Sequence, residues 1–339
     1  MWSECHGSSL TPRISLSPGV FAGSVLPISR KPGRMEEIAC NVCESDSYVV
    51  LYEGRDRLHR LGNSFRFVKC QQCGLVYLNP RPTREEMGQY YPPDYGPYTH
   101  DVERANGFLS GPAYRYGVAK RCRIVTRRKE AGRVLDVGCA TGHFLYGMRL
   151  RGWQTFGTEF SEGAAAYARE RFGLEVLVGT LQEGEFPAAC FDAITIWNVL
   201  EHLPDPLATL MEVNRLLKGD GILVFSIPNW ESADARLWGE FWVGLDMPRH
   251  LYIFPRPALD RLLVKTGFKT IEAGCFFGSH GSFALSLRFL LEERMPQRTL
   301  RRFLLWLSYT KLTRLVASPY FYLVDRLGRG PIITVICTK

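Results

Sequence analysis

Short apolar runs alternate with segments of helical periodicity from about residue 133 to the end of the chain. Runs of this kind predict buried strands, and they fall at residues 134–137, 155–158, 174–178, 191–197, 221–227, 270–277 and 332–337. Strands that alternate with helices predict a parallel sheet that helices cover on both faces. The sequence therefore predicts an α/β fold with a mostly parallel sheet.

Helix start and stop signals lie between these runs. Ser161 is expected to cap a helix that Gly173 ends, and Pro257 is expected to open a later one. Another helix is predicted to begin near Asp205 and Pro206. Its spacing predicts a buried face made of Leu207, Leu210, Met211, Asn214 and Leu217.

Composition divides the rest of the chain into further parts. Residues 1–35 are rich in Ser, Pro and Gly and are expected to form a disordered extension, with Met35 as an alternative start. Tyrosines within residues 79–98 leave open whether that piece covers a ligand or only links two parts. The expected organisation is a metal-binding segment at 36–78, a linker with lid helices at 79–132, and a main domain at 133–339.

The main domain contains a basic insert at residues 278–330. It has a helical pattern and holds nine Lys or Arg against three Asp or Glu, and residues 304–307 are its densest apolar piece. We expect a helical cap over the active site or a dimer contact. A basic amphipathic helix also suits an anionic membrane surface, so peripheral membrane contact through 285–327 is the alternative.

Two C-x-x-C pairs precede the main domain, Cys40 with Cys43 and Cys70 with Cys73, with 26 residues between the pairs. Each pair can place two thiolates on one side of a tetrahedral ion. Four cysteine ligands close the coordination shell, which is typical of structural zinc rather than catalytic zinc. We therefore predict a structural Zn²⁺ site, and reduced thiols in a cytoplasmic protein.

Bulk composition narrows the class only slightly. Hydrophobic residues make up 46% and charged residues 22% of the 339 positions, as in ordinary globular proteins. The net charge of +8 favours anionic partners without naming one. Residues 120–129 carry six Lys or Arg on an expected helix, which we interpret as a solvated face, with nucleic-acid contact as the less favoured alternative. The expected location is the cytoplasm, with the inner membrane face as a peripheral possibility.

The loop after the first predicted strand has the pattern of a nucleotide cradle. Gly138 and Gly142 allow close approach of a ligand to the backbone. Asp136 precedes the loop, and Glu159 ends the second strand, where its carboxylate suits a ribose diol. The loop reads G-x-A-x-G and not the dinucleotide pattern G-x-G-x-x-G. A carboxylate beside the loop repels pyrophosphate and attracts ammonium, which favours S-adenosylmethionine over NAD.

The segments LDVGCATGHF, FGTEFS and FDAITIWNVLEHLPDP resemble class I S-adenosylmethionine-dependent methyltransferases. KCQQCGLVYLNPRPTREEMGQYYPPDY and LDMPRHLYIFPRPALDRLLVKTGF resemble a bacterial subgroup with an N-terminal zinc ribbon. The resemblance implies a Rossmann-like, seven-stranded sheet with an antiparallel last strand. It also implies that the cofactor is bound by Asp136, Gly138, Ala140, Gly142, Glu159, Phe160, Thr180, Leu181 and Asn198. Ala140 replaces a common glycine, and Thr180 replaces a common acidic residue.

Two histidines are candidates for a catalytic base. His202 follows Glu201, and His250 follows Arg249. A base is needed only if the acceptor carries a proton, as a hydroxyl does. The alternatives are that each histidine orients a loop, and that Glu201 belongs to a divalent-metal site.

The predicted activity is methyl transfer to a small molecule or a saccharide, the latter suggested by the resemblance alone. One alternative is an RNA methyltransferase, although the fourth strand ends in NVLEH and lacks the amide-binding Asn-Pro-Pro-Tyr pattern. Another is a binding protein that has lost activity, although Asp136 and Glu159 are intact.

Overall fold

The structure is a computed structural model that describes residues 34–62, 64–92, 95, 112–276 and 279–339. Within these residues, a seven-stranded sheet has the order β12-β13-β10-β9-β6-β7-β8. β13 pairs antiparallel with β10 and β12, and the pairs from β10 to β8 are parallel. The predicted fold class, including the antiparallel last strand, is confirmed. The strands are β6 (Arg133–Val137), β7 (Gln154–Glu159), β8 (Glu175–Val178), β9 (Phe191–Trp197), β10 (Leu217–Pro228), β12 (Lys269–Gly274) and β13 (Ile332–Thr338).

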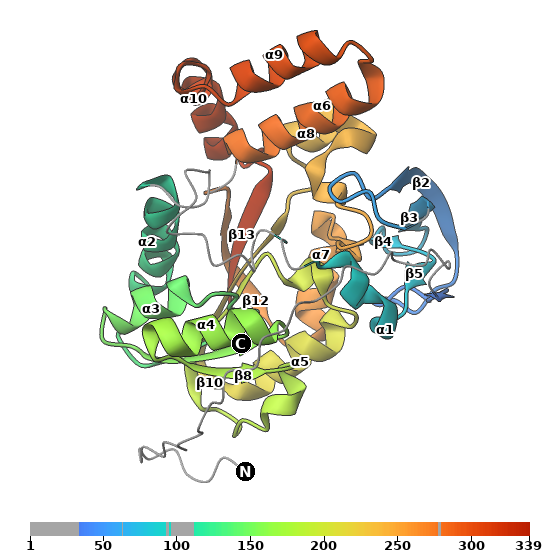
Figure 1. Ribbon diagram of the computed structural model, residues 1–339. Coiled ribbons are helices and arrows are strands. Elements are labelled where there is room, and N and C mark those ends of the chain that lie inside the picture. Colours follow the sequence, from blue (N-terminus) through green and yellow to red (C-terminus); the bar gives the residue numbers. More distant parts are fainter. Residues whose placement is uncertain (1–33, 63, 93–94, 96–111, 277–278) are drawn as a thin grey trace, which may run out of the picture.

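Helices cover both faces of this sheet (Figure 1). Side chains alternate between the faces, so that Val134 packs into one core cluster and Leu135 into the other. The first cluster includes residues of α2 (Pro112–Thr126), α3 (His143–Arg149) and α4 (Glu162–Phe172). The second includes residues of α5 (Pro206–Leu216) and α7 (Arg256–Lys265).

The predicted buried face of α5 is partly wrong. Met211 is 57% exposed, and Leu217 is not helical but pairs with Phe191 as the first residue of β10. The side chains that the helix buries are Pro206, Thr209, Leu210, Val213 and Leu216. The capping predictions hold better, since Ser161 accepts a hydrogen bond from the Ala164 N–H and Gly173 ends α4 in a left-handed conformation.

The N-terminal segment packs onto the main domain. β2 (Tyr48–Arg55), β3 (Ser64–Cys70) and β4 (Val76–Leu78) form an antiparallel sheet, and β11 (Tyr252–Ile253) of the main domain pairs with β4. β1 (Met35–Glu36) pairs with β5 (Arg81–Pro82), and α1 (Arg84–Met87) follows. One core cluster runs continuously from this segment into the main domain. Of the extension at 1–35 that was predicted to be disordered, residues 1–33 lie outside the described residues. Its end is wrong, because Met35 pairs with Pro82 in β1.

The insert is helical, as its sequence pattern indicates. It contains α8 (Ser279–Arg294), α9 (Arg298–Ser308) and α10 (Lys311–Arg326). α8 packs on α6 (Ala233–Trp238), while α9 and α10 lie at the top of the molecule (Figure 1). Among the described residues, no helix has both the length and the apolar character that crossing a membrane requires.

Candidate active site

The loop between β6 and α3 forms a tight cradle at the carboxyl ends of the strands. Gly138 and Gly142 have φ angles of 71° and 78°. A Cβ atom on Gly138 would lie 2.6 Å from the Val199 side chain, and one on Gly142 would lie 2.6 Å from that of Leu174. Only glycine fits either position without strain. Ala140 has a φ of 47°, so its methyl group is held in a conformation that usually favours glycine.

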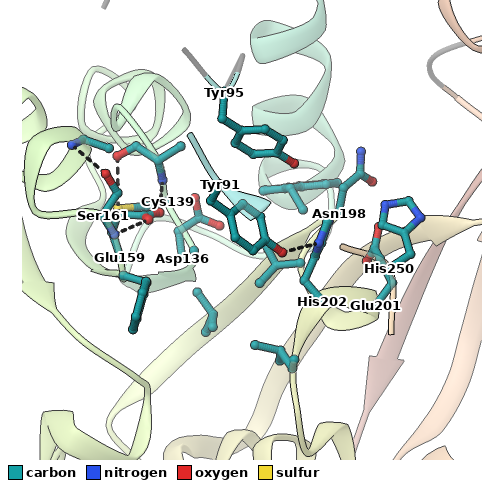
Figure 2. A pocket seen from close by; sticks show the side chains of 18 of the residues that line it. Tyr91, Tyr95, Asp136, Cys139, Glu159, Ser161, Asn198, Glu201, His202 and His250 are labelled. Atoms are coloured by element: carbon teal, nitrogen blue, oxygen red, sulfur yellow. Dashed lines mark hydrogen bonds between the residues drawn. The ribbon is translucent and has the colours of Figure 1, made fainter. Parts of the chain in front are cut away.

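Glu159 fixes this cradle from the end of β7. One carboxylate oxygen accepts a hydrogen bond from the Ala140 N–H and the other accepts one from the Ser161 N–H, both at 2.8 Å. The side chain is buried, and burial raises the pKa of Glu159 even though these hydrogen bonds lower it. Figure 2 shows Glu159 beside Asp136 at the cavity wall.

Asp136 lies at the end of β6 and accepts a hydrogen bond of 2.6 Å from the Thr195 hydroxyl. Burial raises the pKa of this carboxyl group to about 7, against the lowering effect of Thr195 and Arg121. A ligand ammonium group would favour the ionised form. The ionised carboxylate of Asp136 is the negative charge that was predicted to attract the ammonium group of the cofactor's methionine end.

These residues open into one cavity of about 1560 Å³. That volume exceeds the ~300–1,000 Å³ of typical ligand pockets, so it has room for an acceptor beside a cofactor. Gly142 does not line the cavity but packs against Ala168 and Leu174. The other predicted cofactor residues do line it: Asp136, Gly138, Ala140, Glu159, Phe160, Thr180, Leu181 and Asn198. Their roles toward a cofactor remain predictions.

Asn198 and Thr180 are held by neighbours. Asn198 has a φ of 54°, and its carbonyl oxygen accepts a hydrogen bond of 2.5 Å from the Ser226 hydroxyl. The Thr180 N–H donates to the carboxylate of Glu183, which also lines the cavity. Glu183 therefore supplies an acidic group near the position where Thr180 lacks one. Glu183 was not predicted as a site residue, because it lies three residues past Thr180, where the acidic residue is expected.

His202 and His250 line the same cavity and lie next to each other. Their ring centroids are 4.6 Å apart. His202 Nδ1 lies 2.9 Å from the Arg249 carbonyl oxygen, and His250 Nδ1 lies 2.7 Å from that of Gly244. Because a carbonyl can only accept, both Nδ1 atoms carry the proton. Burial lowers the pKa of both histidines, which keeps both rings neutral near pH 7. In each ring Nε2 is then the unprotonated nitrogen, which can accept a proton.

Glu201 completes this cluster. It is 1% exposed, one of its carboxylate oxygens has no hydrogen-bond partner within the described residues, and burial raises its pKa to about 8. One ligand atom from each of Glu201, His202 and His250 lies within 4.8 Å of the others. Groups this close can exchange protons through a bound hydroxyl group, and the same spacing would also suit a divalent ion.

Tyr91 lies in the site, although the sequence did not decide between a ligand-covering role and a linking role. Its hydroxyl lies 3.0 Å from His202 Nδ1, and its ring meets Tyr95 edge to face at 5.1 Å (Figure 2). Both tyrosines line the cavity. Tyr90, by contrast, is buried against Phe65. The tyrosine segment therefore contributes both to a cavity wall and to packing between the two parts of the chain.

A buried ion pair joins the N-terminal segment to the loop that carries His250. The Arg249 guanidinium donates to Asp56 at 2.7 Å and to Asp246 at 2.5 Å, and neither Arg249 nor Asp56 is exposed. Asp56 also accepts hydrogen bonds from three backbone N–H groups, at Leu58, His59 and Leu61. The position of His250 thus depends on residues almost two hundred positions away.

The four predicted metal ligands meet in space. Cys40 Sγ lies 3.3 Å from Cys73 Sγ, Cys43 Sγ lies 3.5 Å from Cys70 Sγ, and all four sulfur atoms lie within 4.8 Å of one another. Tetrahedral Zn–S bonds of about 2.3 Å put sulfur atoms about 3.8 Å apart. The arrangement is compatible with the predicted zinc ribbon.

The strand order, the glycine cradle and the acidic end of β7 define a class I S-adenosylmethionine-dependent methyltransferase fold. Residues 113–273 match the family model described as a methyltransferase domain. Residues 113–273 therefore carry a methyltransferase domain, which confirms the resemblance seen in this part of the sequence.

Curated relatives agree with this assignment. A protein of Alkalilimnicola ehrlichii named ubiquinone biosynthesis O-methyltransferase is 35% identical over 108 residues, which cover 30% of this chain and 43% of that protein. A Mycobacterium tuberculosis protein named as a probable S-adenosylmethionine-dependent methyltransferase is 33% identical over 156 residues, which cover 44% and 54%. The chain thus spans about half the length of the curated relatives it matches.

Similar solved structures include a methyltransferase from Archaeoglobus fulgidus, with a TM-score of 0.46 and 21% identity, covering 66% of this chain and 94% of that one. Another is phosphoethanolamine N-methyltransferase 2 of Haemonchus contortus in complex with S-adenosylmethionine. Its TM-score is 0.49 at 20% identity, and the overlap covers 78% of this chain and 62% of that one.

Proposed function

We propose that this protein transfers a methyl group from S-adenosylmethionine to a hydroxyl oxygen of a small organic molecule or saccharide. The observation that carries the proposal is the neutral histidine pair in the same cavity as the glycine cradle. The relatives named O-methyltransferases support an oxygen acceptor. Zinc bound by Cys40, Cys43, Cys70 and Cys73 is proposed as a structural ion that holds the N-terminal segment.

The cofactor, when bound, supplies an electrophilic methyl group on a sulfonium. Asp136 would attract the ammonium group of its methionine part, and Glu159 would bind the ribose hydroxyls. Nε2 of His250 would accept the proton of the acceptor hydroxyl, which makes the acceptor oxygen nucleophilic toward the methyl group. Tyr91 and the Arg249 carbonyl hold His202 against His250, so His202 is a positioning residue.

The RNA alternative gains no support from the basic run at 120–129. Lys120 donates to the Phe276 carbonyl, Arg128 pairs with Glu272 and Lys129 pairs with Asp220. These three charges serve contacts within the domain, while Arg123 and Arg127 are exposed, so the expected solvated face is only partly present. RNA binding that falls steeply with salt in a filter assay would revive that alternative.

We expect His250→Gln to lower kcat by about 10²–10⁴, because general-base catalysis contributes rate enhancements of that size. His202→Gln should cost less, since it only loosens the partner ring. The assay incubates the protein with labelled S-adenosylmethionine and a panel of hydroxylated aromatics and sugar nucleotides, and mass spectrometry detects products one CH₂ heavier. S-adenosylhomocysteine affinity should stay unchanged in both variants. Wild-type turnover by His250→Gln would contradict the role of the base.

A further inference from the structure

Helices α9 and α10 present a broad apolar face to solvent. Of the 22 large hydrophobic side chains that are exposed among the described residues, 12 lie between Leu300 and Leu327. Several are more than half exposed and recur at helical spacing: Phe303, Trp306, Leu312, Leu315, Val316 and Leu323. Exposed apolar surface of this density on a folded protein marks an interaction site.

The burial pattern excludes packing within the chain as the reason for this face. On α9 the less exposed side holds Arg301, Leu304, Leu305 and Ser308, while Phe303 and Trp306 are more than half exposed. On α10 the buried residue is Phe321, which packs on Phe283 of α8, and Leu315 and Val316 lie on the other side. An amphipathic helix normally has one apolar stripe that faces inward, whereas these two helices carry apolar residues on the packed side and on the exposed side as well.

Positive charge accompanies the apolar face. Arg298, Arg302 and Lys311 make no ion pair with any described residue. The acidic residues of the insert are already engaged. Glu292 pairs with Arg288 and Arg60, Glu293 pairs with Arg55, and Asp325 accepts a hydrogen bond from Ser279. The outer surface of α9 and α10 therefore combines apolar side chains with uncompensated cations.

We propose that α9 and α10 dock onto an anionic phospholipid surface, with both helices lying in the plane of the headgroups. Acyl chains accept the apolar side chains, and lipid phosphates accept the cations. Trp306, Tyr320 and Tyr322 are residues that favour the membrane–water boundary. A second copy of the chain is a poorer occupant, because a two-fold contact would bring the unpaired cations of both copies together.

The docking surface and the reaction cavity share one insert. Gly281, Ser282 and Leu285 of α8 line the cavity, as does Tyr309 between α9 and α10. A membrane bound at α9 and α10 thus lies next to a wall of the cavity, which suits an acceptor carried on a lipid. The docking itself does not depend on methyl transfer, so it can fail or hold independently of the proposed function.

Co-sedimentation with vesicles tests this surface. The wild-type protein should pellet with phosphatidylcholine vesicles that contain phosphatidylglycerol, and less so in high salt. Each Lys or Arg near the headgroups contributes roughly 1 kcal/mol, so the double variant Arg298→Gln/Arg302→Gln should bind about thirtyfold more weakly. Trp306→Ser/Leu315→Ser/Leu323→Ser should lose binding at any salt concentration.

Matched controls test whether vesicle binding is specific to the exposed face of α9 and α10. Met211→Ser/Val264→Ser removes apolar groups that are 57% and 76% exposed on α5 and α7, and Arg123→Gln/Arg127→Gln removes exposed charges at the C-terminal end of α2 and just after it. Both should bind vesicles as the wild type does. Equal binding to pure phosphatidylcholine, or wild-type binding by the patch variants, would overturn the proposal. So would a lipid-free dimer that the patch variants convert to monomer without any vesicle binding.

Discussion

Arg249→Met lowers the free energy of unfolding by about 3–5 kcal/mol, because it leaves two carboxylates facing a site that excludes water. Asp56 is fully buried and Asp246 nearly so. Although burial alone would lower the pKa of Arg249, Asp246 and Asp56 raise it, so the guanidinium is charged at every accessible pH. Chemical denaturation of the wild type and the variant measures the difference.

A matched exposed pair provides the control. Arg256 pairs with Asp260 at 2.8 Å, with both side chains nearly half exposed, so Arg256→Met should cost about 0–1 kcal/mol. The Arg249 variant should also lose turnover beyond its loss of stability, since the same pair holds the loop of His250. If the two variants lose the same small amount of stability, the ion pair does not join the N-terminal segment to the active site.

Cys40→Ser should abolish stoichiometric zinc and unfold the N-terminal segment. Structural zinc contributes about 10–16 kcal/mol of apparent binding free energy in small domains, which is also their folding free energy. Burial raises the pKa of the Cys40 thiol and that of the Cys73 thiol, the latter to about 11. Without a cation these two thiols would therefore stay protonated at neutral pH, whereas hydrogen bonds outweigh burial at Cys70 and lower its pKa to about 7. Metal analysis by mass spectrometry and protease sensitivity of residues 36–78 measure the two effects.

Cys337→Ser is the control for this substitution, because Cys337 is an equally buried cysteine on β13, away from the cluster. It should keep its zinc. Purified wild-type protein that carries no zinc would exclude the metal site altogether. Zinc retained by Cys40→Ser would mean that the ion binds elsewhere.

Much of the fold could be predicted from local patterns in the sequence. The strand alternation predicted the sheet because both of its faces are buried, and neighbouring residues such as Val134 and Leu135 are therefore both apolar. The cradle was accessible because positive φ and close approach demand glycine at Gly138. The error at the end of α5 arose because Leu217 continues the apolar spacing of the helix, although it pairs in a strand with Phe191.

The proposed acceptor end of the site was harder to predict from the sequence, because its contacts join residues that are far apart in the chain. Tyr91 meets His202 across 111 positions, and Arg249 meets Asp56 across 193. No spacing within one segment signals such pairs. For the insert, the sequence suggested a basic amphipathic helix and a membrane contact as one alternative. It could not decide, because periodicity shows that a helix has two faces but not which of them faces solvent.

The central claim is that the Gly138–Gly142 cradle and Glu159 hold S-adenosylmethionine, and calorimetry with the product S-adenosylhomocysteine tests it most directly. The wild type should bind it in a one-to-one complex. Hydrogen bonds to a charged group contribute about 1.5–3 kcal/mol each, so Glu159→Ala should weaken binding about 100-fold or more. Glu162→Ala, an exposed neighbour on α4, should bind as the wild type does. No binding by the wild type, or equal affinity in Glu159→Ala, would contradict the assignment.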